Sequence, residues 1–120
     1  MAQPFQDLVV WQRAMQMTVC IYELTKAFPK DELFGLTSQL RRASVSVASN
    51  IAEGRGRGTE GEFRQFLNIA QGSTYEVQTQ LLVAKQLKIG DDKMLHNAEH
   101  LCIETSKMLG ALIQSLKARS

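Results

Sequence analysis

The amino-acid sequence predicts an all-α protein, an antiparallel up-down-up-down four-helix bundle that forms a single domain over residues 1–120. Two observations predict this class. Apolar residues recur at intervals of three and four through four long segments, and no segment alternates like a β-strand. The two prolines, Pro4 and Pro29, interrupt none of these segments. Four long amphipathic helices with short connections pack most economically as a bundle of antiparallel neighbours.

The first helix is expected over residues 7–27, where Phe28 and Pro29 end it. Its predicted core stripe comprises Leu8, Trp11, Met15, Thr18, Tyr22 and Thr25. Many further apolar residues lie outside this stripe, namely Val9, Val10, Met17, Val19, Cys20, Ile21 and Leu24. A helix that is apolar on several sides is usually buried on two faces. We therefore expect a homo-oligomer whose interface includes this helix.

The second helix is expected over residues 31–54, with Asp31 as its N-cap. Its apolar stripe comprises Leu36, Leu40, Ala43, Val47 and Ile51. The helix should stop before the glycine-rich tract 55–58, which cannot sustain helical structure. This tract is the clearest loop in the chain.

The third helix is expected over residues 59–88, beginning with a capping box at Thr59. Its heptad seam comprises Phe63, Leu67, Ala70, Thr74, Val77, Leu81 and Ala84. The fourth helix is expected over residues 92–117, capped by Asp91 or Asp92. Its predicted stripe comprises Met94, Ala98, Leu101, Thr105, Met108 and Leu112.

An ordered row of polar side chains follows the apolar stripe of the second helix. The row comprises Arg42, Ser46, Ser49, Asn50 and Glu53, which share one helix face. Buried polar groups need hydrogen-bond partners, and Glu76 of the third helix is a candidate counterpart for an arginine. We favour a structural network that fixes helix packing. The alternative is a small enzyme or ligand-binding protein that uses Arg42, Ser46, Asn50 and Glu53, but no histidine or lysine base accompanies them and no catalytic residue is assigned.

Two motifs resemble cofactor sites without their usual context. Residues 56–61 match G-x-G-x-x-G, which binds dinucleotides only after a β-strand, whereas here a helix is expected before it. His96 and His100 match H-x-x-E-H, but a catalytic zinc needs a third ligand, and Glu104 lies too far along the helix. The sequence therefore predicts no metal and no cofactor.

The net charge, the hydropathy and the cysteines indicate which partners and which cellular compartment to expect. A net charge of +2 permits a nucleic-acid partner without requiring one, and Arg55, Arg57 and Arg64 are the candidate contacts. No apolar run approaches the roughly 20 residues that span a bilayer, so no membrane partner is expected. Cys20 and Cys102 are isolated, as reduced core cysteines are. These features predict a cytoplasmic protein.

An ordered set of motifs resembles a known family. The residues are Trp11–Ala14, Phe34–Leu36, Gln39–Ala43, Ser49–Gly54, Glu62, Phe63, Phe66, Leu67, Gly72, Ser73 and Glu76. They are similar to bacterial four-helix-bundle proteins first noticed as reading frames in intervening sequences of 23S ribosomal RNA genes. This resemblance implies a left-handed bundle, a homopentamer and no catalytic residues.

A related branch of the same family, the accessory variability proteins of retroelements, binds a reverse transcriptase and nucleic acid through a strongly basic surface. With a net charge of only +2, this chain departs from that pattern. The expected function is a non-enzymatic oligomeric module whose precise role the sequence leaves open. An RNA or DNA accessory role is one option, and for the arginines of the glycine-rich loop a solvated or intersubunit salt-bridge role is favoured over nucleic-acid contact.

Overall fold

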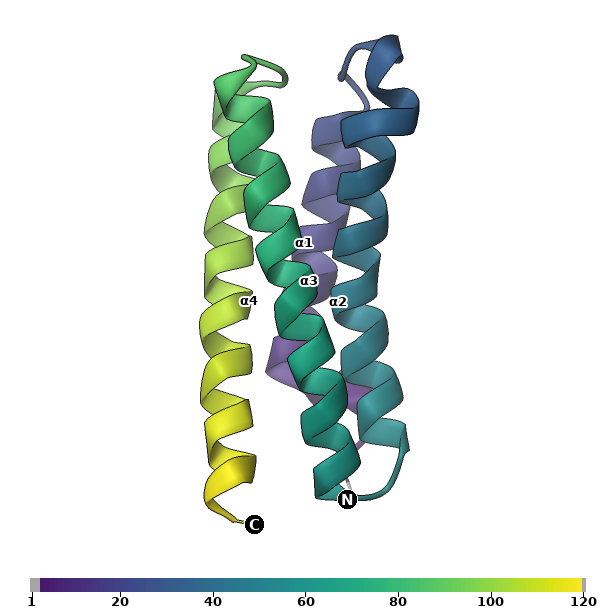
Figure 1. Ribbon diagram of the computed structural model, residues 1–120, viewed down its shortest axis with the longest axis vertical. Helices are drawn as coiled ribbons and strands as arrows, with labels where there is room; N and C mark the ends of the chain where they lie inside the picture. The colour runs from purple at the N-terminus through teal and green to yellow at the C-terminus, as the bar shows by residue number, and fades with distance from the viewer. Residues whose placement is uncertain (1–2, 120) are drawn as a thin grey trace.

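The structure, a computed structural model, describes residues 3–119 and contains four long helices. They are α1 (Val9–Thr25), α2 (Ser38–Gly56), α3 (Glu60–Gln86) and α4 (Asp92–Ala118). The described chain has no strand and forms a rod of 45 × 20 × 20 Å (Figure 1). The all-α class is thereby confirmed. Over the same residues, no helix is both long and apolar enough to cross a lipid bilayer.

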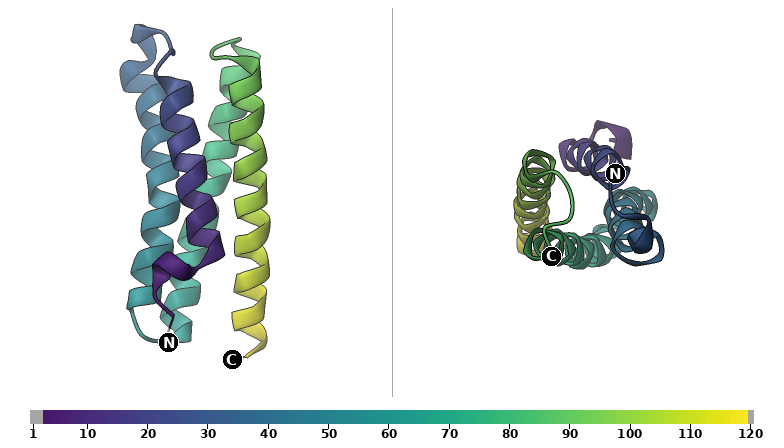
Figure 2. Two further views of the ribbon diagram at one scale, coloured as in Figure 1. Left: turned by 180° about the vertical axis from the view of Figure 1, so that it is seen from behind. Right: turned by 90° about the horizontal axis from the view of Figure 1, so that it is seen from above.

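The four helices lie at the corners of a square when the rod is viewed from its end (Figure 2). The chain runs up α1, down α2, up α3 and down α4, so the two ends of the chain lie at the same end of the rod (Figure 1). Helices that follow one another in the sequence pack side by side, as α1 with α2, α2 with α3 and α3 with α4. Contact between α4 and α1 closes the square.

The first helix is shorter than expected at both ends. It begins at Val9 rather than at residue 7, because Leu8 has extended backbone angles and residues Phe5–Asp7 form a separate 3₁₀ turn. It ends at Thr25 rather than at residue 27, where the amide of Phe28 donates to the Thr25 carbonyl at 3.1 Å. The chain then turns towards Pro29.

The expected start of the second helix at Asp31 was wrong. Residues Lys30–Glu32 form a 3₁₀ turn and Leu33–Thr37 a π turn, and the α-helix begins only at Ser38. The physical reason is Gly35, whose φ of −112° and ψ of −115° are not helical and separate the two segments.

The cap of this region also differs from the expectation. Glu32, not Asp31, accepts a hydrogen bond from the Leu36 amide, at 3.1 Å. At its other end the helix continues past residue 54 to Gly56, and the left-handed φ of +92° at Gly58 turns the chain into the loop.

The expected caps of the third and fourth helices are confirmed. The Thr59 hydroxyl accepts from the Glu62 amide at 3.2 Å, and the Asp91 carboxylate accepts from the Met94 amide at 3.0 Å. The Thr59 hydroxyl in turn donates to the Glu62 carboxylate of the capping box at 3.3 Å. These caps define the starts of α3 and α4 at residues 60 and 92.

The buried faces match the sequence best in the middle of the chain. All seven residues of the predicted α3 seam are buried, and so are the five of the predicted second-helix stripe. In α1 and α4 only part of the predicted stripe is buried, namely Thr18 and Thr25 in α1 and Ala98 and Thr105 in α4, and the rest of the core comes from neighbouring positions. The buried residues there are Val10, Ala14, Met17, Thr18, Ile21, Leu24 and Thr25 in α1, and Leu95, Ala98, Cys102, Thr105, Leu109 and Leu116 in α4.

The two incomplete matches have a common cause. Both helices carry apolar residues on two adjacent stripes, and periodicity alone does not say which of them faces the core. In α1, Met15 and Tyr22 of the predicted stripe therefore reach the surface, while Trp11 is half-buried. In α4 the residues Met94 and Leu101 pack at the margin of the core.

Candidate functional site

Part of the polar row forms a hydrogen-bonded cluster between α2 and α3. The hydroxyls of Ser46 and Ser73 lie 3.0 Å apart and share a hydrogen bond. The Asn50 amide donates to the Ser46 carbonyl at 2.8 Å and to the Ser46 hydroxyl at 3.0 Å. All three side chains are therefore occupied with one another across the helix pair. Ser73, which lies on α3, was not among the residues of the predicted row.

The rest of the row lies on the surface, so the row does not form one buried network. Arg42, Ser49 and Glu53 are exposed, and Glu53 pairs with Arg57 at 2.9 Å on the same helix. Glu76 is also exposed, and no arginine of α2 lies within 4 Å of it among residues 3–119. The row spans a wide arc of the helix, and only its edge towards α3 reaches the next helix.

The Ser46 cluster should contribute modestly to stability. We expect Asn50→Ala to lower the free energy of unfolding by about 1 kcal/mol, because the half-buried Ser46 oxygens lose their donor. Glu53→Ala is the matched control on the same helix and should change it by less than about 0.5 kcal/mol, since an exposed ion pair contributes little. Urea unfolding of both variants checks this. Equal effects would remove the cluster as a packing element.

The other helix pairs carry polar contacts that the sequence patterns did not identify. The Thr18 hydroxyl donates to the Ser44 carbonyl at 3.1 Å between α1 and α2. Between α3 and α4, the Gln71 amide donates to the Ser106 carbonyl at 3.0 Å, and its oxygen accepts from the Ser106 hydroxyl at 2.9 Å. The sequence signal that could have identified these contacts was serine or threonine at heptad positions that face the core.

The arginines around the α2–α3 loop are already engaged within the chain. Arg55 donates to the Gln3 carbonyl at 2.8 Å and its guanidinium carbon lies 5.4 Å from the centre of the Phe63 ring. Arg57 stacks on the Phe66 ring at 4.9 Å and pairs with Glu53. Arg64 is half-buried in the first turns of α3 and has interactions of its own. These side chains gather at one end of the rod, where they remain partly exposed.

The two cofactor-like motifs occupy helices and an open loop. Residues 56–61 join α2 directly to α3, with no strand before them. His96 and His100 are exposed on α4, and residues 3–119 contain no group of three histidine, cysteine or acidic side chains that could hold a metal ion.

The two cysteines are free thiols in different surroundings. Cys102 is completely buried, and burial raises its pKa to about 12. Its thiol lies 3.3 Å from the Thr74 carbonyl, to which it donates. Cys20 is half-buried, and burial raises its pKa too. Both therefore stay in the thiol form at neutral pH and neither is an activated nucleophile.

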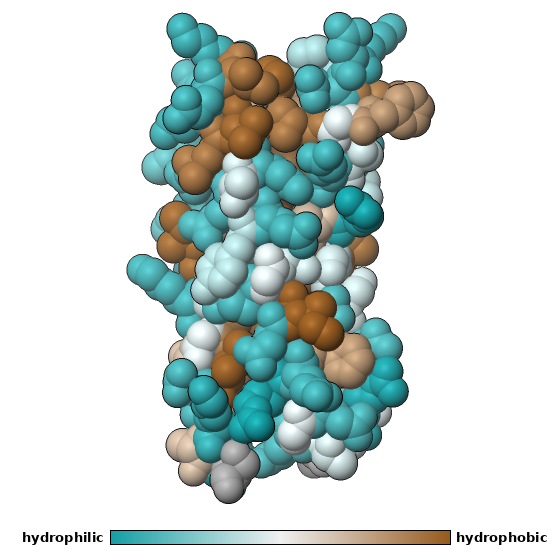
Figure 3. Space-filling view, viewed as in Figure 1, coloured by the Kyte–Doolittle hydropathy of each residue, from teal (hydrophilic) through white to brown (hydrophobic). Residues whose placement is uncertain are grey.

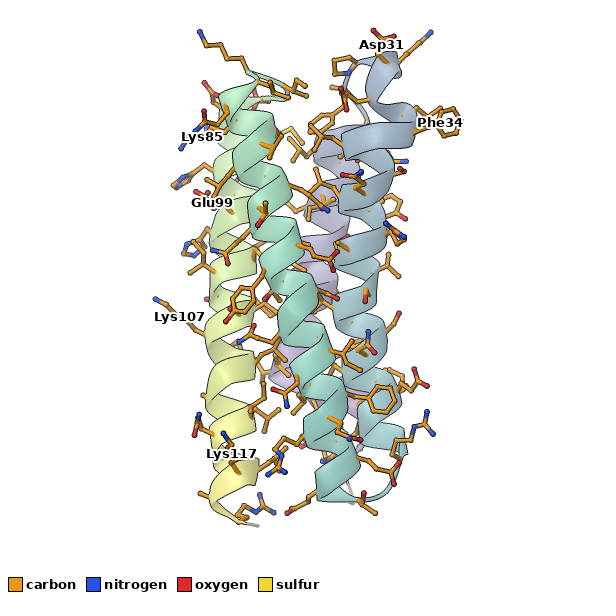
Figure 4. All side chains as sticks on the ribbon, in the orientation of Figure 1. Asp31, Phe34, Lys85, Glu99, Lys107 and Lys117 are labelled. Carbon is orange, nitrogen blue, oxygen red and sulfur yellow. The ribbon has the colours of Figure 1, made fainter. Side chains whose placement is uncertain are left out.

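Apolar side chains are exposed along α1, α2 and the turn between them. A hollow of about 300 Å³ is lined chiefly by Trp11, Met15, Val45 and Ala48. Phe34 is 90% exposed in the turn, and Figure 4 shows its side chain pointing away from the bundle. Contiguous apolar surface of this kind usually marks an interaction site.

A protein family and a solved structure resemble this chain. The family model described as 23S rRNA-intervening sequence protein matches residues 6–111. A solved structure with a similar fold is a protein with unknown function from the S23 ribosomal protein family of Bacteroides thetaiotaomicron VPI-5482. It superposes with a TM-score of 0.80 at 22% sequence identity, covering 88% of this chain and 96% of that chain. None of the curated proteins matches.

Proposed function

This chain belongs to the family of 23S rRNA-intervening sequence proteins, and we propose that it acts without catalysis, as a self-associating helical module. The observation that carries the proposal is the apolar face of α1 and α2. Met15 and Val45 are more than one-third exposed on this face and line the hollow together with Trp11. A single chain leaves this surface in water, and a second copy would cover it.

A second apolar strip supports a cyclic assembly. On the outer face of α3, the exposed residues are Ile69, Tyr75, Leu82, Val83 and Leu87. Figure 3 shows brown side chains gathered over the front of the rod, mainly in its upper half. A ring of more than two copies needs two different faces that meet each other. The proposal therefore includes a closed ring, with five copies and the left-handed bundle that the family resemblance implies.

The proposed module works in the cytoplasm and has no enzymatic activity. Reduced thiols at Cys20 and Cys102 suit that compartment. In the polar row, the Asn50 amide donates to Ser46, and the Ser46 hydroxyl shares a hydrogen bond with Ser73, which leaves no activated nucleophile or base among them.

Assembly is tested by placing a charge on the α1 face. Met15 is 38% exposed in the single chain, so Met15→Glu should fold, but its carboxylate would be buried at the proposed interface. We expect light scattering to show an oligomer for the native protein and the 13.4-kDa single chain for the variant. Ile103→Glu, at a similarly exposed position on α4, is the control and should still assemble. A native protein that scatters as a single chain would refute the proposal.

A nucleic-acid accessory role is the second candidate function. Three arginines, Arg55, Arg57 and Arg64, gather at one end of the rod, and the Arg57 side chain keeps 46% of its surface exposed. Combining Arg55→Glu with Arg57→Glu should weaken RNA binding by at least about tenfold at low salt, because phosphate contacts dominate such affinity. Fluorescence anisotropy with a labelled RNA measures this. Lys85→Glu combined with Lys107→Glu is the charge-matched control, because both exposed lysines lie away from that end of the rod (Figure 4). Native protein that binds no RNA at low salt would exclude the role.

A further inference from the structure

A second hollow lies on the α1–α2 face, beside the start of α2. Its volume is about 410 Å³, and its walls include Tyr22, Leu33, Thr37, Arg41 and Arg42. The wall is thus part aromatic and aliphatic and part cationic. The sequence patterns did not mark it, because Tyr22 and Arg41 come from different helices.

Arg41 is held in a fixed orientation at this hollow. Its guanidinium carbon lies 4.7 Å from the centre of the Tyr22 ring, in a cation–π contact. Its Nε donates to the Thr25 hydroxyl at 2.9 Å. That hydroxyl is buried and donates in turn to the Ile21 carbonyl at 2.7 Å, so its lone pair is directed at Arg41. These two contacts therefore occupy the face of the guanidinium, which lies over the Tyr22 ring, and its Nε edge, which donates to Thr25.

The remaining edge of Arg41 has no anionic partner in the chain. Over residues 3–119, no carboxylate lies within 4 Å of Arg41 or of the neighbouring Arg42. Arg57 provides the contrast, because it also stacks on an aromatic ring but is paired with Glu53 at 2.9 Å. Two adjacent guanidiniums on a hollow thus lack the counter-charge that the comparable arginine has.

We propose that the hollow at Tyr22, Arg41 and Arg42 binds an oxyanion, a phosphate or carboxylate group carried on an apolar body. A planar guanidinium held at Nε presents its terminal N–H groups in the fork that such oxygens match. Thr37 adds a hydroxyl to the wall, and Leu33 contacts the apolar body of the ligand, whereas the Ser38 hydroxyl already donates to the Gly35 carbonyl at 3.2 Å. The oxyanion comes either from a free ligand or from an acidic side chain of a second copy, since the hollow shares Val45 with the proposed interface.

Thermal unfolding of the full chain in inorganic phosphate, against chloride at equal ionic strength, tests the site. We expect saturable stabilisation of the native protein, with an apparent affinity at least about tenfold weaker in Arg41→Gln. Arg13→Gln is the matched control and should keep the native response, because Arg13 already pairs with the Glu104 carboxylate at 2.7 Å. It also reports the general stabilising effect of phosphate, which does not saturate.

Arg41→Lys covers the case in which the glutamine variant does not fold. It keeps the charge but loses the fork, and it should lose the saturable response to the same extent. If a second copy supplies the oxyanion, Arg41→Lys should instead lower the assembled mass in chloride, and phosphate should dissociate the native oligomer. Native-like phosphate response and native-like assembly in both Arg41 variants would overturn the site. If the Arg41 variants still assemble and Met15→Glu does not, the proposal of an oligomer stands by itself, independently of the oxyanion site.

Discussion

Replacing Gly54 with alanine is expected to lower the free energy of unfolding by about 2 to 3 kcal/mol, because α3 packs directly against Gly54 and leaves no room for a methyl group. A methyl group on Gly54 would lie 2.5 Å from the Phe66 Cβ and 3.3 Å from both the Phe63 ring and its carbonyl oxygen. Two of these atoms belong to the backbone or adjoin it, so a rotamer change cannot move them. The helices would have to separate along a buried seam.

Gly56→Ala provides the control for this effect on the same helix. No atom lies within 4 Å of the position that its methyl group would take. Alanine favours helix over glycine, so this variant should keep or raise stability, by up to about 1 kcal/mol. Chemical unfolding followed by far-UV circular dichroism compares the two. Equal stabilities would contradict the close packing of α2 and α3 at Gly54.

Gly90→Ala is expected to cost about 2 to 4 kcal/mol, since it combines backbone strain with a steric clash. Gly90 has a φ of +95°, in the left-handed region that alanine rarely adopts. A methyl group there would also lie 2.8 Å from the Phe28 ring and 3.2 Å from the Leu24 side chain. The α3–α4 turn would therefore lose its packing on the end of α1.

Gly58→Ala separates the two contributions. Gly58 has nearly the same φ, +92°, but no atom lies within 4 Å of the position that its methyl group would take. Only the backbone strain remains, and we expect a loss of about 1 kcal/mol. The difference between the two variants, measured in one urea series, reports the packing of Gly90. A Gly90→Ala effect no larger than that of Gly58→Ala would mean that Phe28 and Leu24 move aside freely.

How well each helix could be predicted depended on how its apolar residues are distributed. In α3 one heptad seam runs unbroken from Phe63 to Ala84, whereas the apolar residues on its outer face do not repeat as an unbroken heptad, so the buried face could be assigned from the sequence. In α1, Met15 and Met17 belong to competing stripes of similar hydrophobicity. Only contact with α2 and α4 shows that Met17 is buried while Met15 reaches the surface.

The start of α2 could not be predicted from residue preferences. Asp31 is an ordinary N-cap candidate, yet the backbone angles of Gly35 interrupt the helix and move its start to Ser38. The same interruption exposes Phe34 and forms one wall of the hollow at Arg41. A glycine in a helical pattern signals such a break only weakly, because many helices tolerate it.

The sequence by itself determined the all-α class, the four helices, the cap at Thr59 and the membership of the family. These follow from local periodicity, capping chemistry and motif order, which need no knowledge of the neighbours. The tertiary structure alone decided which side chains meet. It joined Ser46 to Ser73 and Arg41 to Tyr22, because such contacts depend on how the helices are rotated against one another.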